Sequence, residues 1–361
     1  MQKLNMENLG FAEPLIQESK RYKNLLVGRV TSQSKNLYTV MTENGEITAT
    51  VSGKFHYQVK EVSEYPAVGD FVMVDRIEHS EGQGIIHHGL TRKSAFVRKV
   101  AGSRNDGQVV AANIDTVFIC MALTNDFNIR RMERYLSIAW NSGAVPVIVL
   151  TKADLCADIE NKLHEIQTIA FGVDVHVTTC TSRDGYQSLK SYLSPGKTVA
   201  FIGSSGVGKS TLINCLLGEH VLETGSTRKD DKGRHTTTRR ELIILPESGV
   251  VIDTPGMREL GIIHADVAKS FVDIEKLAAD CKFNDCTHTN EPDCAVQRAI
   301  QEGTLSAARL VNYRKLKKEA KYAGLNSKMI EKEKVNDLFR EMGGMKNARK
   351  FLQEQQRKKR R

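Results

Sequence analysis

The sequence predicts an α/β protein in which a parallel sheet is preceded by a small all-β barrel and followed by an α-rich segment. Three observations indicate this order. Short β-rich runs fill residues 25–98, strand and helix patterns alternate from about residue 113, and helical stretches after residue 261 flank a cluster of Cys and His. Strands that alternate with helices are typical of a parallel sheet covered on both faces. We predict a loosely ordered leader at 1–24, a barrel at 25–100, an α/β domain at 101–262 and a helical domain with a basic tail at 263–361.

Composition and charge limit the function classes. Of the 361 residues, 40% are hydrophobic and 26% are charged, as in ordinary globular proteins. The sequence has no apolar run of 18 residues and no signal core, so we expect a cytoplasmic protein without a membrane partner, and a monomer. The net charge of +9 is concentrated in Leu305–Arg361, which holds 18 Lys or Arg against 6 Asp or Glu. This segment is either a solvated basic face or an arm that binds polyanions.

Residues 25–98 carry the strand signals of a small closed barrel. The runs 25–30, 37–42, 46–51, 71–77 and 84–90 are β-rich, and Asn44-Gly45 between the second and third is a strong hairpin signal. Some seventy residues of short strands without a helix favour a barrel of the oligonucleotide-binding (OB) type. Other small barrels share this pattern.

The next region predicts a series of strands and helices that form one sheet. We expect strands at 116–123, 146–150, 173–179, 198–203, 241–246 and 249–254, and helices at 128–140, 157–170 and 209–218. Parallel sheets bind ligands in the loops beyond the carboxyl ends of their strands, and each nucleotide motif that we identify lies in such a loop.

The most specific motif is a phosphate-binding loop of the form G-x-x-x-x-G-K-[ST] between a predicted strand and a predicted helix. It consists of Gly203, Ser204, Ser205, Gly206, Val207, Gly208, Lys209, Ser210 and Thr211. Glycines let backbone N–H groups converge on phosphate oxygens, and the helix N-terminus adds its positive dipole end. We expect Lys209 to reach the β- and γ-phosphates and Ser210 to hold Mg²⁺.

Two further segments would complete a magnesium and γ-phosphate site. Asp253-Thr254-Pro255-Gly256 follows an apolar strand, so Asp253 is expected in the Mg²⁺ shell and the Gly256 amide at the γ-phosphate. The long polar stretch before it contains three consecutive threonines, one of which should bind Mg²⁺ in the triphosphate state. We favour Thr237, with Thr238 as the alternative.

A third motif selects the base. Thr151, Lys152, Ala153 and Asp154 follow the strand at 146–150 and fit the pattern N/T-K-x-D, with Thr151 where Asn is usual. The Asp154 carboxylate can accept hydrogen bonds from guanine N1–H and the 2-amino group, whereas adenine would leave it unpaired. Lys152 should pack its stem along the base. Thr179 and Cys180 are the candidates for the loop that backs it.

The order of these motifs is unusual. The guanine motif comes first, followed by the base-backing loop, the phosphate loop and the two switch segments, whereas the phosphate loop usually leads. A circular permutation preserves the site because all the loops still leave the same edge of one sheet. The sequence therefore predicts a circularly permuted P-loop GTPase domain that uses GTP, GDP and Mg²⁺.

The cluster that follows has metal-ligand spacing. Cys281, Cys286, His288 and Cys294 supply three thiolates and one imidazole, a full tetrahedral shell for Zn²⁺ with no position left for a substrate. We predict one structural zinc ion per chain; buried thiols are the alternative. Metal would order a loop whose apolar content is too small to do so.

The permuted order, the segment Gly233–Thr238 and the Cys/His spacing after Asp253–Gly256 together resemble the RsgA family of GTPases that depend on the small ribosomal subunit. The resemblance covers roughly residues 25–300. It implies an OB barrel, a central GTPase domain, a zinc domain, and a role in late maturation of the small subunit, with binding to its rRNA and hydrolysis stimulated by that subunit. The alternatives are a translation-factor-like GTPase on mature ribosomes and an RNA-binding scaffold that uses GTP as a structural ligand.

Hydrolysis needs a group that positions water. A Gln after the second-switch glycine often does so, but here the residue is Met257, so intrinsic turnover should be slow, on the order of 10⁻³ to 10⁻² s⁻¹. His235, beside the Mg²⁺-binding threonines, is our candidate for the catalytic residue, because imidazole can donate or accept a hydrogen bond near neutral pH. The alternative is a solvent-exposed loop histidine.

Overall fold

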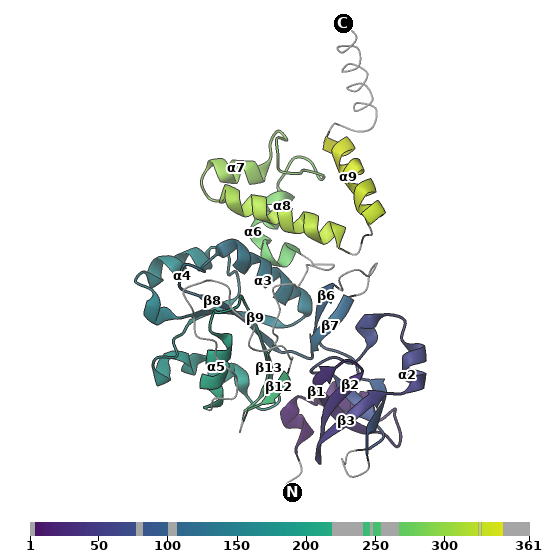
Figure 1. The fold of residues 1–361 in the computed structure, drawn as a ribbon. Coiled ribbons are helices and arrows are strands. Elements are labelled where there is room, and N and C mark those ends of the chain that lie inside the picture. Colours follow the sequence, from purple (N-terminus) through teal and green to yellow (C-terminus); the bar gives the residue numbers. More distant parts are fainter. Residues whose placement is uncertain are drawn as a thin grey trace.

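The computed structural model describes residues 4–76, 82–99, 107–218, 241–245, 248–253, 267–323, 325 and 327–341. Figure 1 shows a central α/β unit with the barrel at one side and the C-terminal helices at the other. The predicted order of a barrel, an α/β unit and a helical segment with a Cys/His cluster is confirmed. None of the helices within the described ranges is both long and apolar enough to cross a membrane.

The N-terminal residues are more ordered than predicted. They form η1 (Met6–Leu9) and α1 (Glu13–Ser19). Met6 and Leu9 are buried in the same apolar cluster as Phe71 of the barrel, and the Leu9 carbonyl accepts a hydrogen bond from the Arg29 guanidinium. These contacts, which no local pattern reveals, explain why the segment is not a loose leader.

Five strands close the barrel. They are β1 (Leu26–Ser34), β2 (Leu37–Thr42), β3 (Gly45–Val51), β4 (Phe71–Val74) and β5 (Gly84–Gly89). The order is β1-β2-β3-β5-β4, and β4 pairs back onto β1. β3 and β5 run parallel, and the other barrel pairs run antiparallel. The interior is a separate apolar cluster made of Val30, Tyr38, Val40, Ile47, Ala49, Val72, Val74 and Ile86.

The expectation of a barrel region without a helix is wrong. A short helix, α2 (Gly53–Gln58), and a 3₁₀ turn, η2 (Val62–Glu64), connect β3 to β4. The Ser52 hydroxyl accepts a hydrogen bond from the Phe55 N–H at 3.0 Å and so caps α2, while the Phe55 ring is buried. Six residues are too few to show a helical period in the sequence.

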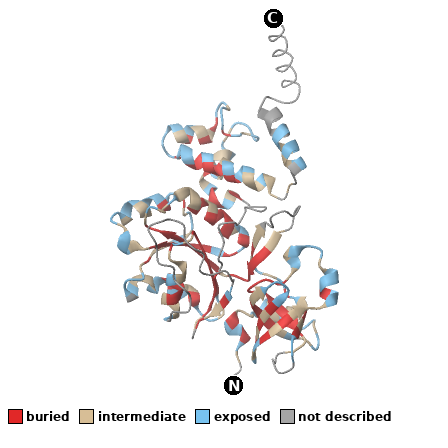
Figure 2. Cartoon of the chain, viewed as in Figure 1, coloured by how far each residue is buried: buried red, intermediate tan, exposed pale blue. Residues whose placement is uncertain are grey.

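The central sheet has a parallel core. Its strands are β8 (Thr116–Ala122), β9 (Val145–Thr151), β10 (Asp174–Val177), β11 (Thr198–Ile202) and β13 (Val250–Asp253), in the order β10-β9-β8-β11-β13. Every one of these neighbouring pairs is parallel. All seven residues of β8 are buried because the strand is covered on both faces, which explains its continuous apolar run. Figure 2 shows this burial along the strands.

One strand departs from the predicted parallel series. β12 (Glu241–Ile244) runs antiparallel to β13, since only a short connection separates the two. On its other side β12 meets the barrel, where Glu241 pairs with Ser32 of β1. The barrel and the α/β unit are therefore joined in one eleven-stranded sheet.

Helices cover both faces of the sheet. α3 (Ile129–Ser142) and α4 (Ile159–Gln167) pack into the apolar cluster on one face, whereas η5 (Arg183–Leu193) and α5 (Lys209–Leu217) pack into the cluster on the other. The strands β6 (Ala95–Lys99) and β7 (Gly107–Ala112), which the sequence did not predict, form a separate antiparallel pair between the barrel and the α/β unit.

The C-terminal helices share the core of the α/β unit. They are η7 (Val267–Ser270), α6 (Val272–Ala279), α7 (Ala295–Gln301), α8 (Ala307–Tyr322) and α9 (Ser327–Glu341). Phe271, Leu310 and Tyr313 belong to the same apolar cluster as Met132 and Leu136 of α3. Figure 1 shows α8 lying over α6 and α3.

Candidate nucleotide and metal sites

The phosphate loop has the shape that its glycines predict. Gly203 follows β11 with φ 147°, and a Cβ there would lie 2.3 Å from the Cys120 carbonyl oxygen, so no other residue fits. Gly206 and Gly208 also have positive φ, 78° and 97°. α5 begins directly after Gly208, so Ser210 and Thr211 lie in its first turn and Ser204, Ser205 and Val207 lie in the loop.

Two charged side chains lie at this loop. The Lys209 ammonium donates to the carbonyl oxygens of Gly203 at 3.0 Å and Ser204 at 2.7 Å. Asp253 is buried at the end of β13, where it pairs with Phe201 of β11. Burial raises the pKa of the Cys120 thiol to about 12; the Lys209 charge opposes this rise and the Asp253 charge reinforces it. Asp253 pairs with Phe201 of β11 and Lys209 bonds to Gly203 just after β11, so a carboxylate and a cation both lie at the carboxyl end of this strand, where the phosphates and Mg²⁺ of a nucleotide are expected.

The guanine motif is bonded to the phosphate loop. The Thr151 hydroxyl, at the end of β9, donates to the Val207 carbonyl at 2.5 Å. Lys152 has the left-handed backbone φ of 58°, and its Cε lies 4.0 Å from the position of a Cβ on Gly208. The unusual Thr151 thus holds two loops together, a role that the sequence did not predict.

The base-backing loop is bonded to the guanine motif in turn. The exposed Asp154 carboxylate accepts a hydrogen bond from the Thr179 hydroxyl at 2.6 Å, and the Ala153 N–H donates to the Thr178 carbonyl at 3.2 Å. Burial, together with a hydrogen bond to Cys215 of α5, raises the pKa of the Cys180 thiol to about 12. The three predicted loops therefore meet at one edge of the sheet.

Part of the predicted site lies outside the described residues. His235, Thr237, Thr238 and Gly256 belong to the segments 219–240 and 254–266, of which no placement is given. Their predicted roles in hydrolysis, Mg²⁺ binding and γ-phosphate binding remain predictions.

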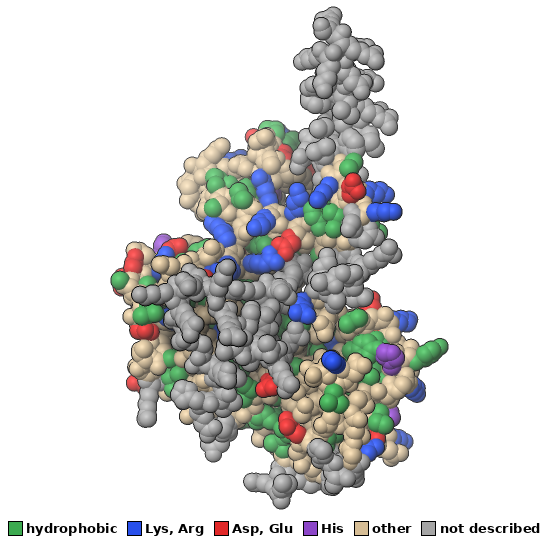
Figure 3. All heavy atoms as spheres, in the orientation of Figure 1, with side chains coloured by type: hydrophobic (Ala, Val, Ile, Leu, Met, Phe, Trp, Pro, Cys, Tyr) green, Lys and Arg blue, Asp and Glu red, His purple; other side chains and the backbone are tan. Residues whose placement is uncertain are grey.

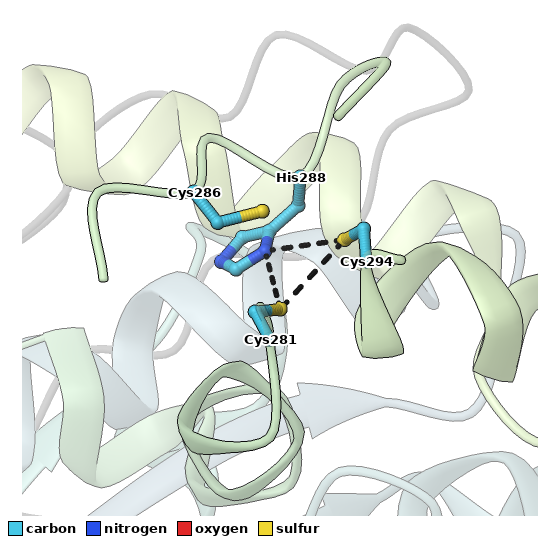
Figure 4. Close-up of side chains that lie close together, drawn as sticks. All are labelled: Cys281, Cys286, His288 and Cys294. Atoms are coloured by element: carbon cyan, nitrogen blue, oxygen red, sulfur yellow. Dashed lines mark hydrogen bonds between the residues drawn. The ribbon is translucent and has the colours of Figure 1, made fainter. Parts of the chain in front are cut away.

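The Cys/His cluster converges on one point. Cys281 follows α6, Cys294 precedes α7, and Cys286 and His288 come from the loop between them (Figure 4). His288 Nδ1 lies 3.6 Å from both the Cys281 and the Cys294 sulfur, and these two sulfurs are 3.8 Å apart. All four ligand atoms lie within 4.8 Å of one another. Tetrahedral Zn²⁺, with Zn–S of about 2.3 Å and Zn–N of about 2.0 Å, separates its ligand atoms by about 3.5–3.8 Å, so the cluster fits a metal ion of this kind.

The surroundings favour the ligand form at Cys281 and His288 but not at Cys286, where burial and hydrogen bonds to Cys294 and Cys281 raise the pKa of the thiol to about 12. Burial raises the pKa of the Cys281 thiol, but hydrogen bonds from the Val296 and Ala295 N–H groups outweigh this and leave the pKa below its usual range. Burial and the Arg314 charge lower the pKa of His288, which keeps its imidazole neutral. Thiolate and neutral imidazole are the forms that bind metal.

Basic side chains gather on the C-terminal helices. Figure 3 shows Lys and Arg side chains over α8 and α9. The exposed ones are Lys315, Lys317, Lys318 and Lys321 on α8, and Lys328, Lys332 and Lys334 on α9. The described part of the basic segment is thus a solvated surface with an excess of positive charge, on which Lys321 pairs with Glu333 at 3.1 Å and Glu331 is also exposed.

Two family models match parts of this chain. A family model described as RsgA GTPase matches residues 89–263. A second model, described as ABC transporter, matches residues 186–355, which contain the phosphate loop but not the guanine motif.

Full-length relatives and solved structures agree with the first match. The protein named small ribosomal subunit biogenesis GTPase RsgA 2 from Lactiplantibacillus plantarum is 47% identical over 96% of this chain and 98% of its own. RsgA 1 from Oceanobacillus iheyensis is 46% identical over 82% and 86%. The crystal structure of YjeQ from Thermotoga maritima is similar with a TM-score of 0.60 and 28% identity, covering 82% of this chain and 98% of that one. The structure of YloQ, described as a circularly permuted GTPase, has the same fold, with a TM-score of 0.58 and 24% identity over 83% and 96%.

Proposed function

The chain belongs to the RsgA family and is a GTP hydrolase, and on that premise we propose that it binds the small ribosomal subunit and assists its late maturation. GTP, GDP and Mg²⁺ follow from the GTPase family. We propose the small subunit as the partner because a relative that matches nearly the whole chain is named for the biogenesis of that subunit.

One observation carries the nucleotide assignment. The Thr151–Val207 and Asp154–Thr179 hydrogen bonds link the guanine motif, the phosphate loop and the base-backing loop, although these come from separate parts of the chain. The Thr179 hydroxyl occupies one carboxylate oxygen of Asp154 and leaves lone pairs for guanine N1–H and the 2-amino group. A fixed carboxylate of this kind discriminates against adenine, which offers no donor at N1.

We assign the remaining roles as follows. Lys209 contacts the β- and γ-phosphates, Ser210 and Asp253 hold the Mg²⁺ shell, and the first-switch Thr237, with Thr238 as the alternative, completes that shell. The Gly256 amide contacts the γ-phosphate. His235 positions the attacking water when the subunit is bound.

We also propose that Cys281, Cys286, His288 and Cys294 hold one structural Zn²⁺. The ligand distances support zinc, and four protein ligands leave no position for a substrate. The zinc would fix the loop between α6 and α7 on which the C-terminal helices pack. The boundaries 1–24, 25–100, 101–262 and 263–361, the monomeric state and the cytoplasmic location are part of the same proposal.

The rRNA contact is supported by charge. Seven lysines of α8 and α9 are exposed, and the basic residues of 342–361 extend the same segment in sequence. Such clusters bind phosphates without reading bases and release counterions, so the affinity for the subunit should fall steeply with salt.

The test is GTP hydrolysis by the full chain with and without purified small subunits. We expect slow turnover alone, a large stimulation by subunits, and loss of that stimulation in His235→Ala with GTP affinity retained. Asp154→Asn is the matched control for the base site and should lose guanine selectivity, shifting toward xanthosine nucleotides. Retained selectivity in Asp154→Asn would contradict the base assignment, and full stimulation in His235→Ala would remove His235 from the mechanism.

A second experiment separates assembly from translation. Sedimentation of ribosomal particles from cells depleted of the protein should show immature small subunits. Normal small subunits with impaired translation would instead favour a factor that acts on mature ribosomes.

A further inference from the structure

The barrel carries a pocket that none of the nucleotide or metal motifs explains. A cavity of about 630 Å³ opens between the β1–β2 turn, the connection through α2 and η2, and strand β7. This volume lies within the range of about 300–1,000 Å³ that is typical of small-ligand sites. None of its lining residues belongs to the three nucleotide loops or to the Cys/His cluster.

Aromatic rings form one side and the floor of the pocket. The rings of Tyr65 and His56 lie 5.8 Å apart, and the Tyr65 hydroxyl contacts His56 Nδ1. Tyr38 is buried at the floor, where its hydroxyl accepts a hydrogen bond from Gln33 Nε2 at 3.3 Å. Burial, reinforced by Tyr65, raises the pKa of Tyr38 to about 12, so the floor stays uncharged at physiological pH. A neutral planar ring is the ligand group that such walls accommodate.

The rim of the pocket adds groups for hydrogen bonding and for a negative charge. Gln33, Asn36 and Gln108 line it. The Gln33 amide nitrogen already donates to the Tyr38 hydroxyl and to the Lys35 carbonyl at 3.5 Å, and the Gln108 amide oxygen accepts from Arg98 at 3.5 Å. The Gln33 oxygen, the Gln108 nitrogen and the Asn36 amide supply an acceptor, donors and both, as the edge of a nucleobase requires. Lys35 is exposed at the β1–β2 turn, and among the described lining residues there is no Asp or Glu. Together, the Tyr65 ring, the amides and the Lys35 ammonium match the base and the phosphate of one nucleotide.

The wall that carries Tyr65 is rigidly supported. The Arg92 guanidinium donates to the Ser63 carbonyl at 2.6 Å and to the Tyr65 carbonyl at 2.7 Å, and it pairs with the buried Asp70 carboxylate at 2.6 Å. A binding side chain on a backbone held in this way loses little entropy when a ligand is bound.

We propose that this pocket holds one unpaired nucleotide of an RNA strand, with its base against the Tyr65 ring and its phosphate near Lys35. The proposal rests on the proposed function, because it identifies a point at which the barrel would contact rRNA. Proteins that read single-stranded RNA stack unpaired bases on aromatic side chains and bond to their edges. A protein side chain as occupant is less favoured, because it would not use the polar groups of the rim and the Lys35 cation together.

The test uses fluorescein-labelled five-nucleotide RNA strands in which one central base, A, C, G or U, stands between abasic residues. A fifth strand has no base. Fluorescence anisotropy with the full chain should show tighter binding of at least one base-containing strand. Tyr65→Ala should weaken the binding of that strand about five- to hundredfold, the range found when base-stacking aromatics are removed. Tyr65→Phe, which keeps the ring, should retain most of the affinity.

Two controls make the result specific. Tyr57→Ala removes an aromatic side chain that is 91% exposed on the same helix as His56 but does not line the pocket, so it should bind like the unchanged protein. Amide hydrogen exchange of β1–β5 in Tyr65→Ala and Tyr65→Phe checks that the barrel, which has its own core, is folded, and GTP affinity checks the α/β unit.

The inference is overturned if strands with and without a base bind equally, which is also the result expected of a pocket for a protein side chain. It is likewise overturned if Tyr65→Ala weakens both kinds of strand alike. Subunit-stimulated GTP hydrolysis, measured on the same preparations, distinguishes the two failures. If stimulation is intact while the strands bind equally, the pocket assignment alone is wrong; if subunits do not stimulate at all, the proposed function fails.

Discussion

Two buried arginines join the central α/β unit to its neighbours, and they are stabilised in different ways. Arg29 of the barrel is fully buried and donates to neutral acceptors, namely the carbonyls of Leu9 and Gly69 and, at 2.9 Å, the Thr198 hydroxyl. Arg309 of α8 lies between two carboxylates, Asp273 at 2.6 Å and Glu133 at 2.7 Å.

The pKa values reflect this difference. Burial lowers the pKa of Arg29 to about 10, although the charges of Asp115 and Asp70 oppose it. Burial acts on Arg309 in the same direction, but hydrogen bonds and charge from Asp273 and Glu133 outweigh it and raise the pKa. The contact between the barrel and the α/β unit, which we call the barrel junction, thus relies on backbone acceptors and a continuous sheet. The contact between the C-terminal helices and the α/β unit, which we call the helical junction, relies on opposite charges that each need a partner. Removing the arginine side chain should therefore lower the free energy of unfolding more at the helical junction than at the barrel junction.

Loss of zinc should cause the largest loss of stability, and this loss should be confined to the C-terminal helices. Cys286→Ser removes one thiolate, and we expect a local loss on the order of 5 kcal/mol, a fraction of the roughly 10–16 kcal/mol that structural zinc contributes in small metal-dependent domains. Metal analysis should show less than one zinc per chain, and hydrogen exchange should rise in α6–α8 but not in the barrel. Cys156→Ser, outside the cluster, is the control and should keep its metal. Unchanged zinc in Cys286→Ser would contradict the assignment.

Arg309→Met should have the next largest effect, about 3 kcal/mol, because Glu133 is 0% exposed and loses the buried one of its two arginine partners. The partner that remains is Arg130 at 2.8 Å, which is 36% exposed. Hydrogen exchange of α8 amides measures the change. Arg134→Ala is the matched control: its pair with Glu319 joins the same two helices but is 29% and 35% exposed, so its loss should cost less than about 1 kcal/mol.

The double variant Glu133→Gln with Arg309→Met sharpens the comparison. It removes both charges, so it should be less destabilised than Arg309→Met alone. If Arg309→Met proves no more damaging than Arg134→Ala, the helical junction is not held by its buried charges.

Arg29→Met should have the smallest effect of the three, about 1–2 kcal/mol. It leaves carbonyl acceptors unpaired, but the buried Asp70 carboxylate keeps its ion pair with Arg92 at 2.6 Å, and the long apolar side chain fills most of the space. Thermal unfolding and exchange of β1 amides measure it, with Thr198→Val as a milder control. A loss equal to that of Arg309→Met would remove the distinction between the two junctions.

The sequence predicted what local patterns encode. The glycines of the phosphate loop, Asp154 and the Cys/His spacing carry their chemistry in a few adjacent positions, so the motifs could be recognised one by one. All five barrel strands and the strands of the sheet were also predicted, because alternation and apolar runs report burial directly.

The remaining features depend on contacts between distant residues. Nothing near Thr151 indicates that its hydroxyl bonds to Val207, and nothing near Arg29 indicates that a charged side chain on a strand turns inward to meet Thr198. The antiparallel direction of β12 could have been predicted from its short connection to β13, because parallel neighbours need a crossover of a dozen or more residues. Its pairing with β1 of the barrel leaves no local signal. The short helix α2 could have been found from its capping residue, Ser52, which precedes an apolar residue at the capping distance.

The pairing of Ser32 with Glu241 also has a consequence for synthesis. β1 leaves the ribosome early and its partner β12 only after some two hundred further residues, so the barrel can complete its separate core long before the shared sheet exists. Domains fold as units in the order of their synthesis, and distant strand pairs form slowly. We expect pulse-labelled hydrogen exchange to show protection of β2 and β3 before β12. The barrel and the central sheet would then join late in the folding of the nascent chain.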